Sequence, residues 1–549
     1  MRDPRWGRSH ETSGEDPYLT GQYALQYVRG MQEGVDTRYY KVVSTCKHWL
    51  AYDLETGDDG VDRHHFNAVV SDLDLAETHL PAFESCVRDA KAAGVMCSYN
   101  EVNGVPTCSS PLFEQTLLRD QWGFTGHVVS DCGAIEDISD AHKYASDPTH
   151  AVGLALNSGT DMECQFGEMY YQTHGQRAID AGLLTVERVN TAVARAYETL
   201  VRLGYFDAAT TQPYRHIDNT YWNSTEAHRV SLQAAQEGLV LLKNNDNSLP
   251  LRAGRVKTIA VIGHAANESL LGPYIVQAPY DITILAGLQQ ASTARGLTVR
   301  YALGAYIADN DTSHFAEAVE LAKSADVVIF VGGTNQSVSS EGRDQTSLAL
   351  PGVQLQLIQQ LEQASKAPLI TLIIGGVSTD IIYLRDSPTV GSILWVGYPG
   401  MVAGTAVASV LFGEYSPAGR LPITIYPAEY AGQVRMGQMA MRPTASYPGR
   451  TYKVQSSNTP TLTHTMHAAN RHGQPHTSLC CSHPLLICSA LFLPPLPVLT
   501  FSLPSSDVLI SSLIHLLLPP PPSMALSLSG CLTTGASHGM VTISPTTTG

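Results

Sequence analysis

Apolar positions in the first 207 residues alternate between short runs and longer amphipathic stretches. The short runs have the length of buried strands and cover residues 41–45, 94–98, 127–130 and 154–157. The amphipathic stretches predict helices over residues 72–90, 111–122 and 185–203. Alternating strands and helices favour a parallel sheet, most simply a barrel. A complete barrel takes about 250 residues, so we expect 1–207 to form an incomplete (β/α)8-type barrel that lacks one or two leading units.

A second α/β region follows a linker over residues 208–224, whose first part is rich in Thr, Pro and Asp. Near-continuous apolar runs predict strands over residues 258–262, 327–331, 369–374 and 392–396, with a helix over 351–365. Such runs are typical of strands that are covered on both faces. The fold class is therefore α/β, with a sandwich domain over residues 225–426.

The composition changes after Lys453. Residues 454–549 contain only Arg471 and Asp507 as acidic or basic residues other than histidine, and show neither a helical nor a strand period. Prolines interrupt the apolar stretches well before the roughly 20 residues that a membrane helix needs. We expect a low-complexity, unstructured tail, an aberrant extension outside the evolved fold.

Charge and cysteine spacing exclude several functional classes. The net charge of −16 disfavours binding to nucleic acid. The ten cysteines lack zinc-site spacing. No Gly-x-Gly-x-x-Gly turn follows the run 258–262, which disfavours dinucleotide binding. We therefore expect no metal and no organic cofactor.

Several features are typical of secreted proteins. N-glycosylation sequons begin at Asn223, Asn267, Asn310 and Asn335. Together with the spaced cysteines they indicate an oxidising, extracellular history. The first residues lack the apolar segment of a signal peptide, so we expect the natural N-terminus to lie further upstream.

The strongest single candidate for chemistry is Asp131. It ends the apolar run 127–130 and is followed by Cys132 and Gly133. In α/β barrels the catalytic groups stand at the carboxyl ends of the strands. The alternative is that Asp131 only caps the following helix, since Asp is a preferred N-cap residue.

Four motifs decide between these two interpretations. They are Arg-Asp-Pro-Arg-Trp-Gly-Arg at 2–8 with Glu-Thr-Ser-Gly-Glu-Asp-Pro at 11–17, Cys-Lys-His-Trp at 46–49, Cys-Ser-Tyr-Asn-Glu-Val-Asn-Gly at 97–104, and Ser-Asp-Cys-Gly-Ala at 130–134. In this order, over residues 2–453, they resemble glycoside hydrolase family 3, in its fungal and plant β-xylosidase branch. The resemblance implies a barrel followed by an α/β sandwich, here marked by Ala-Gly-Arg-Leu-Pro at 418–422. It also implies that 427–453 is the remnant of a connection to a missing fibronectin-like domain.

The resemblance implies two catalytic carboxylates. Asp131 matches the nucleophile, and Glu341, in Ser-Glu-Gly-Arg-Asp-Gln at 340–345, matches the acid/base. A group that donates a proton must be protonated, so we expect the pKa of Glu341 to lie above that of Asp131. Alternatively, Glu341 pairs with Arg343 on a solvated loop. Asp344 is a weaker rival for the acid/base role.

The resemblance further implies a sugar subsite. Its matching residues are Arg8, Lys47, His48, Arg63 and Tyr99. Cationic donors suit a ligand rich in hydroxyl groups. Arg63 could instead belong to a structural ion pair, and Tyr99 could be a core residue with a satisfied hydroxyl. His64 and His65 are left without a role.

In the β-xylosidase branch the residue after the nucleophile is Cys, here Cys132, which tends to bond to a cysteine in the next strand's loop, here Cys164. Such a bridge would narrow the pocket against a hexose hydroxymethyl group, and Cys97 with Cys108 is a second candidate pair. The resemblance implies a retaining exo-β-xylosidase that releases xylose from xylo-oligosaccharides. The alternatives are a β-glucosidase or α-L-arabinofuranosidase of the same family, and a sugar-binding protein without turnover.

Overall fold

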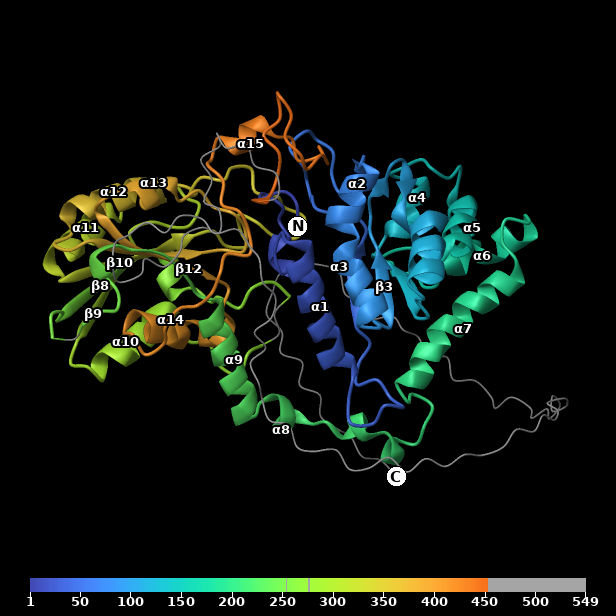
Figure 1. The fold of residues 1–549 in the computed structure, drawn as a ribbon, viewed down its shortest axis with the longest axis horizontal. Coiled ribbons are helices and arrows are strands. Elements are labelled where there is room, and N and C mark those ends of the chain that lie inside the picture. Colours follow the sequence, from blue (N-terminus) through green and yellow to red (C-terminus); the bar gives the residue numbers. More distant parts are fainter. Residues whose placement is uncertain (253, 275–276, 453–549) are drawn as a thin grey trace, which may run out of the picture. The chain divides into compact units, whose positions relative to one another are not determined.

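The computed structural model describes residues 1–252, 254–274 and 277–452. It contains two α/β regions that follow one another along the chain, the first in blue to teal and the second in green to yellow (Figure 1). The predicted tail 454–549 lies outside the described residues. Within the described residues, no helix is both long enough and apolar enough to span a membrane.

The first region is built on a three-stranded parallel sheet with the order β1-β3-β6. Its strands are β1 (Thr45–Trp49), β3 (Gly94–Cys97) and β6 (His127–Ser130). The strands predicted at 94–98 and 127–130 are confirmed as β3 and β6. The strand predicted at 41–45 is wrong, because pairing with β3 starts only at Thr45 and β1 continues to Trp49. A second small sheet joins β2 (Asn67–Ala68), β4 (Glu101–Val102) and β5 (Val105–Pro106).

The run 154–157, predicted as a strand, lies in helix α5 (Pro148–Ser158). Asp147 caps this helix by accepting a hydrogen bond from the His150 amide, Pro148 occupies the first turn, and the helix ends at Gly159 with a φ of 138°. A four-residue apolar run cannot distinguish a strand from one face of a buried helix. The helix start signals Asp147 and Pro148 and the stop signal Gly159 therefore indicate a helix where the apolar run alone does not.

The predicted helices of the first region are present. Residues 72–89 contain α2 (Asp72–Asp74), a π-helical turn (Leu75–His79), α3 (Pro81–Glu84) and a second π-helical turn (Ser85–Asp89). The stretch 111–122 is a π-helix over Leu112–Gln121. The other helices are α1 (Pro17–Gln32), α4 (Ala134–Ser139), α6 (Tyr170–Asp180) and α7 (Val186–Arg202).

The segment predicted as a linker contains short helical turns over Ala209–Thr211 and Pro213–His216, then α8 (Asn219–Trp222). The second region begins with α9 (Thr225–Gly238) and forms a six-stranded sheet with the order β7-β12-β11-β10-β8-β9. Its strands are β7 (Val240–Asn244), β8 (Thr258–Ile262), β9 (Thr298–Ala302), β10 (Val327–Gly333), β11 (Leu369–Ile374) and β12 (Val390–Gly397). All neighbours are parallel except β12 and β7. The four predicted strands are confirmed.

Helices cover both faces of this sheet, as the continuous apolar strands predict. Alternate strand residues pack on one face against α9, α10 (Ile284–Thr293) and α14 (Ala403–Leu411). The other face packs against α11 (Phe315–Ser324), α12 (Gln354–Ala364) and α13 (Ile382–Asp386). Since β8 connects to β9 on one side while β10 lies on the other, the carboxyl ends of β8 and β10 form a topological switch point, where open α/β sheets bind ligands.

Residues 427–452, which include α15 (Tyr430–Gln433), pack against the start of the chain. Arg450 pairs with Asp3, and both side chains are fully buried. Arg2 pairs with Asp53 at 2.8 Å and also donates to the Met436 carbonyl. Breaking a buried ion pair leaves an uncompensated charge and typically costs about 3–5 kcal/mol. These pairs therefore hold the N-terminal loop, which carries Arg8, in a fixed place.

Candidate active site

The candidate residues come from the carboxyl ends of strands and from the loops beside them. Lys47 and His48 lie on β1, Tyr99 follows β3, and Asp131 follows β6. Arg8 and Arg63 lie on loops of the first region. Glu341 lies on the loop that follows β10, at the switch point of the second sheet.

Asp131 presents one committed and one available oxygen. Its Oδ1 accepts the Cys132 N–H at 2.8 Å. Its Oδ2 is buried, accepts no hydrogen bond from the described residues, and lies 3.4 Å from His48 Nε2. Burial raises the pKa of Asp131, an effect opposed by the Cys132 amide, Tyr99, Arg8 and Lys47. Asp131 does not cap the following helix: the N-cap residue of α4 is Gly133, and no side chain caps this helix.

His48 is buried and uncharged. Burial lowers its pKa well below 6.5, and the nearby charges of Arg8, Lys47 and Arg63 lower it further. Its Nε2 lies 3.1 Å from Arg8 Nη2 as well as beside Asp131. The ring thus separates the guanidinium from the carboxylate without adding a charge.

Arg8 connects the two carboxylates. It is 2% exposed, and its guanidinium makes a two-point contact with Glu11, at 2.6 and 3.0 Å. Its Nη1 lies 3.5 Å from Glu341 Oε1. Lys47 reaches the same Glu11 at 3.4 Å. One cationic side chain therefore contacts both His48, beside Asp131, and Glu341.

Glu341 is the most exposed member of the cluster, with 39% of its side chain accessible. Its Oε1 accepts a hydrogen bond from Arg63 Nη1 at 3.0 Å, and its Oε2 accepts one from the Tyr274 hydroxyl. Burial by itself raises the pKa of Glu341, but Tyr274, Arg8 and Arg63 outweigh it and lower the pKa below 4.5. The expected raised pKa is therefore wrong for the free site, because three donors stabilise the carboxylate. The alternative pairing with Arg343 is also not formed: that guanidinium donates to the Ser337 carbonyl.

Arg63 and Tyr99 lie against one another. The guanidinium carbon of Arg63 is 4.6 Å from the centre of the Tyr99 ring, and Arg63 Nη1 donates to Glu55 Oε2 at 3.0 Å. Tyr99 is 4% exposed. Burial raises the pKa of its hydroxyl, and the charge of Asp131 raises it further. Each residue is thus packed as its alternative supposed, while Arg63 also binds Glu341 and Tyr99 also borders Asp131.

Three residues of the cluster were not predicted. Glu11 lies in the first motif and could have been found there, because it stands three residues after Arg8. Glu55 is 1% exposed and accepts hydrogen bonds from Trp6, Tyr52, Arg63 and the Gly342 amide. Tyr274 comes from the second region, and no sequence pattern marks it. Its hydroxyl donates a hydrogen bond to Glu341 and accepts one from Arg8 at 3.0 Å.

Asp344 is a structural anchor of the loop that carries Glu341. Its Oδ2 accepts the amides of Glu55, Thr56 and Gly57 at 2.7–2.9 Å, and its Oδ1 accepts the Gly7 amide at 2.9 Å. Gly7 has no room for a Cβ, which would collide with the carbonyls of Ser340 and Arg343. Burial raises the pKa of Asp344 to about 6 against the effect of these four amides. With both oxygens engaged, it does not compete with Glu341 for the acid/base role.

Both predicted cysteine pairs lie at disulfide-bonding distance. The Cα atoms are 5.2 Å apart in Cys97–Cys108 and 4.3 Å apart in Cys132–Cys164. A third bridge, Cys46–Cys86, was not predicted, since spacing along the chain does not determine connectivity. Cys132 follows Asp131 directly, so the Cys132–Cys164 bridge restrains the backbone beside that carboxylate.

The sequons differ in their surroundings. The side chains of Asn223, Asn267 and Asn310 are exposed. Asn335 is partly buried, and its amide donates to Glu268 at 2.6 Å. Three of the four predicted sites are thus accessible for attachment of a glycan.

A hollow of about 640 Å³ opens beside Glu11, Lys47 and His48. Helix α1 contributes the aromatic side chains of Tyr23 and Tyr27 to its wall, whereas Asp131 and Glu341 are not among its lining residues. No group of three or more His, Cys, Asp or Glu placed to hold a metal ion occurs within 1–252, 254–274 and 277–452.

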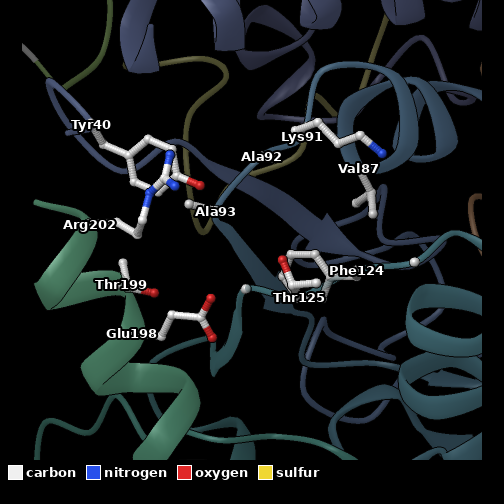
Figure 2. Close-up of a pocket in the computed structure, with 12 residues that line it drawn as sticks. Tyr40, Val87, Lys91, Ala92, Ala93, Phe124, Thr125, Glu198, Thr199 and Arg202 are labelled. Carbon is white, nitrogen blue, oxygen red and sulfur yellow. The ribbon is translucent and has the colours of Figure 1, made fainter. Parts of the chain in front are cut away.

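A second cavity lies at the opposite ends of the same strands (Figure 2). It is lined by residues that precede β3 and β6, such as Ala93 and Phe124, and by Glu198, Thr199 and Arg202 of α7. Its volume of about 60 Å³ is too small for a sugar ring. At this face of a barrel, residues serve stability rather than catalysis.

Comparison with known proteins gives the family of both regions. Residues 1–199 match the glycosyl hydrolase family 3 N terminal domain, and residues 239–463 match the glycosyl hydrolase family 3 C-terminal domain. A probable exo-1,4-beta-xylosidase of Aspergillus terreus is 46% identical over 457 residues, covering 82% of this chain and 58% of that protein. Beta-D-xylosidase 3 of Arabidopsis thaliana is 40% identical over 466 residues, covering 84% and 59%.

Among solved structures, a family 3 exo-beta-xylosidase in complex with a xylobiose aziridine activity-based probe superposes with a TM-score of 0.79 at 40% identity. The match covers 83% of this chain and 59% of that one. The chain thus spans somewhat under three fifths of the length of these relatives. Since both domain models match in order and together cover most of the sequence, the chain belongs to glycosyl hydrolase family 3.

Proposed function

We propose that this chain is a retaining exo-β-glycosidase that acts on xylo-oligosaccharides and releases β-xylose from their non-reducing ends. The observation that carries the proposal is the pairing of a buried carboxylate that has one free oxygen, Asp131, with a second carboxylate, Glu341, on the other side of Arg8. Retaining glycosidases need one carboxylate that attacks and one that transfers a proton.

In this mechanism Asp131 Oδ2 attacks the anomeric carbon, and the bond from that carbon to the leaving oxygen breaks. Glu341 gives its proton to the leaving oxygen, which departs as an alcohol, and the sugar remains as an ester on Asp131. Glu341, now a carboxylate, takes a proton from water, whose oxygen attacks the same carbon and releases Asp131. Two inversions give net retention of configuration.

The remaining residues bind the sugar and stabilise charge. Arg8 and Lys47 supply cationic donors, which form strong hydrogen bonds with sugar hydroxyls. Neutral His48 accepts a hydrogen bond from Arg8 at Nε2, and its uncharged ring leaves the charge of the nucleophile unpaired. Arg63 and Tyr99 line the side of the subsite nearest Glu341.

Specificity for a pentose is the finer part of the proposal. The Cys132–Cys164 bridge lies directly beside Asp131, where a hexose would carry additional bulk. Extracellular location and glycosylation at Asn223, Asn267 and Asn310 are proposed on the exposed sequons and the disulfide pairs.

Initial rates on 4-nitrophenyl glycosides test the substrate. We expect kcat/KM for the β-D-xyloside to exceed that for the β-D-glucoside and the α-L-arabinofuranoside by about tenfold or more, the scale on which one additional group in a restricted pocket is discriminated. A preference for either of the other two would select that activity instead. Xylose binding with no turnover by folded protein would select the sugar-binding alternative.

The Asp344 anchor gives a second expectation. Asp344→Ala leaves four amides without an acceptor, and two of them, those of Gly7 and Glu55, belong to buried residues. The loop that carries Glu341 then loses its anchor. We expect a fall in kcat/KM of about 100-fold, as a displacement near 1 Å can cause, and a loss of about 3 kcal/mol in the free energy of unfolding. The assay above and denaturant unfolding measure the two effects.

Arg343→Ala is the matched control, because it removes a neighbouring exposed side chain, which donates to the Ser337 carbonyl. It should retain nearly full activity and stability. Equal behaviour of the two variants would mean that the four amide contacts do not position the loop.

A further inference from the structure

His64 lies within a line of polar contacts that runs from α4 to Glu341. Its Nδ1 is 2.7 Å from Asp137 Oδ2, and its Nε2 accepts a hydrogen bond from Arg63 Nε at 3.3 Å. Arg63 Nη1 in turn donates to both Glu55 and Glu341 at 3.0 Å. The position of Arg63 therefore depends on an imidazole that has no place in the mechanism so far.

Only one protonation state of His64 satisfies both of its contacts. A carboxylate accepts hydrogen bonds and cannot donate them, so Nδ1 must carry a proton toward Asp137. The Arg63 Nε–H can only donate, so the His64 Nε2 must be unprotonated. The doubly protonated ring would turn both an N–H and a positive charge toward Arg63.

The contact with His64 gives Arg63 a second fixed point. Glu55 and Glu341 both reach the same nitrogen, Nη1, and a single nitrogen does not determine the plane of a guanidinium. The bond from Nε to His64 contributes to fixing it, together with a hydrogen bond between Arg63 and Tyr52 and the stacking of the guanidinium on Tyr99 at 4.6 Å. His64 itself rests against Tyr99, with ring centres 4.5 Å apart.

We propose that His64, oriented by Asp137, is a positioning residue that holds Arg63 in the plane from which it contacts Glu341. The inference rests on the proposed function, because it concerns the acid/base carboxylate of that reaction. It assigns no proton transfer to His64. Its effect on the reaction passes entirely through Arg63.

The proposal carries a dependence on pH. The groups that face His64 are Asp137 on α4, the Tyr99 ring after β3, and Asp62 and Arg63 on its own segment. The hydrogen bond with Asp137 raises the pKa of His64 above 6.5, while burial and Arg63 oppose that rise. The bond from Arg63 therefore exists above this raised pKa and is lost as the pH falls through it.

The variant His64→Phe tests the role, since it keeps a ring against Tyr99 and removes both nitrogens. We expect kcat/KM for 4-nitrophenyl β-D-xyloside to fall by about tenfold at a pH above the His64 pKa. In an Arg63→Ala background the same change should have no further effect. An equal loss in both backgrounds would overturn the proposal, because a packing role would cost activity whether or not Arg63 is present.

The ratio of wild-type to His64→Phe activity should approach one as the pH drops below the His64 pKa. Asp137→Asn removes the charge that raises this pKa. In the Asp137→Asn background, the ratio of activity without to activity with His64→Phe should therefore approach one only at a lower pH than in the wild-type background. A ratio that does not change with pH would contradict the proposal. These comparisons need only that both proteins turn over the xyloside, and the absence of turnover in wild type would refute the proposed function separately.

One readout does not depend on turnover. The Arg63 Nε–H should exchange slowly with solvent in an NMR spectrum of the wild-type protein, and rapidly in His64→Phe or below the His64 pKa. Equal exchange in both proteins at every pH would refute the positioning role even in a chain without activity.

Discussion

Replacing Asp131 by alanine should lower kcat on 4-nitrophenyl β-D-xyloside by about 10⁴-fold or more, since removal of a covalent nucleophile takes away an entire reaction path. The structure leaves little that could substitute for it. The free Oδ2 lies next to the His48 ring, whose Nε2 lone pair already accepts a hydrogen bond from Arg8, and a guanidinium is not a nucleophile. Sugar binding should persist, because Arg8, Lys47 and His48 are unchanged.

The same experiment can identify the attacking oxygen directly. A 2-deoxy-2-fluoro-β-xylosyl fluoride should accumulate as an ester on the peptide that contains Asp131, and mass spectrometry locates the added mass. Asp180→Ala, which removes an exposed carboxylate of α6, is the matched control and should behave as wild type. Labelling of another carboxylate, or unimpaired turnover by Asp131→Ala, would show that the nucleophile has been misassigned.

The residues of the site that could be predicted from the local sequence pattern alone are those that stand at the end of a recognisable apolar run. The apolar run 127–130 ends at Asp131 because a buried strand must end where its backbone reaches the site, and β6 has these bounds in the structure. The four inner strands of the second sheet were predictable because burial on both faces leaves an uninterrupted apolar run, whereas the edge strands β7 and β9 were not predicted. The run 154–157 failed because its capping residues, Asp147 and Gly159, lie outside it.

Contacts between distant segments could not be predicted. Glu55 receives hydrogen bonds from Arg63 and from the Gly342 amide, and Gly342 lies 287 residues further along the chain than Glu55. Tyr274 reaches Arg8 across 266 residues, and no periodicity marks it. The lowered pKa of Glu341 is a product of these same contacts, which is why its expected direction was wrong.

The measured pKa values should therefore depend on whether the sugar is bound. In the free site Arg8, Arg63 and Tyr274 hold Glu341 as a carboxylate, yet the first step needs it protonated. A substrate whose hydroxyls engage Arg8 and Arg63 withdraws those donors from Glu341 and lets its pKa rise. The form with Asp131 ionised and Glu341 protonated is thus a minor one until substrate binds.

Replacing Glu341 by alanine should lower kcat/KM for xylobiose by about 10²–10⁴-fold, the usual contribution of general acid catalysis. The fall should be far smaller for 2,4-dinitrophenyl β-D-xyloside, whose leaving group departs without a proton. With that substrate the second step becomes slow, so the ester on Asp131 should accumulate in a burst. Added azide, which needs no general base, should restore turnover and yield a β-xylosyl azide.

The pH profile gives the same variant a second signature. In wild type, kcat/KM should fall as the pH rises, because Glu341 loses its proton, and the lowered pKa of Glu341 places this fall on the acidic side. This fall at rising pH, the basic limb of the profile, should lie at higher pH in kcat than in kcat/KM, because kcat reports the sugar-bound state. It should disappear in Glu341→Ala. Glu320→Ala, an exposed position on α11, is the control and should keep both limbs. An equal loss on both substrates with the basic limb retained would mean that Glu341 supports the loop and that another group transfers the proton.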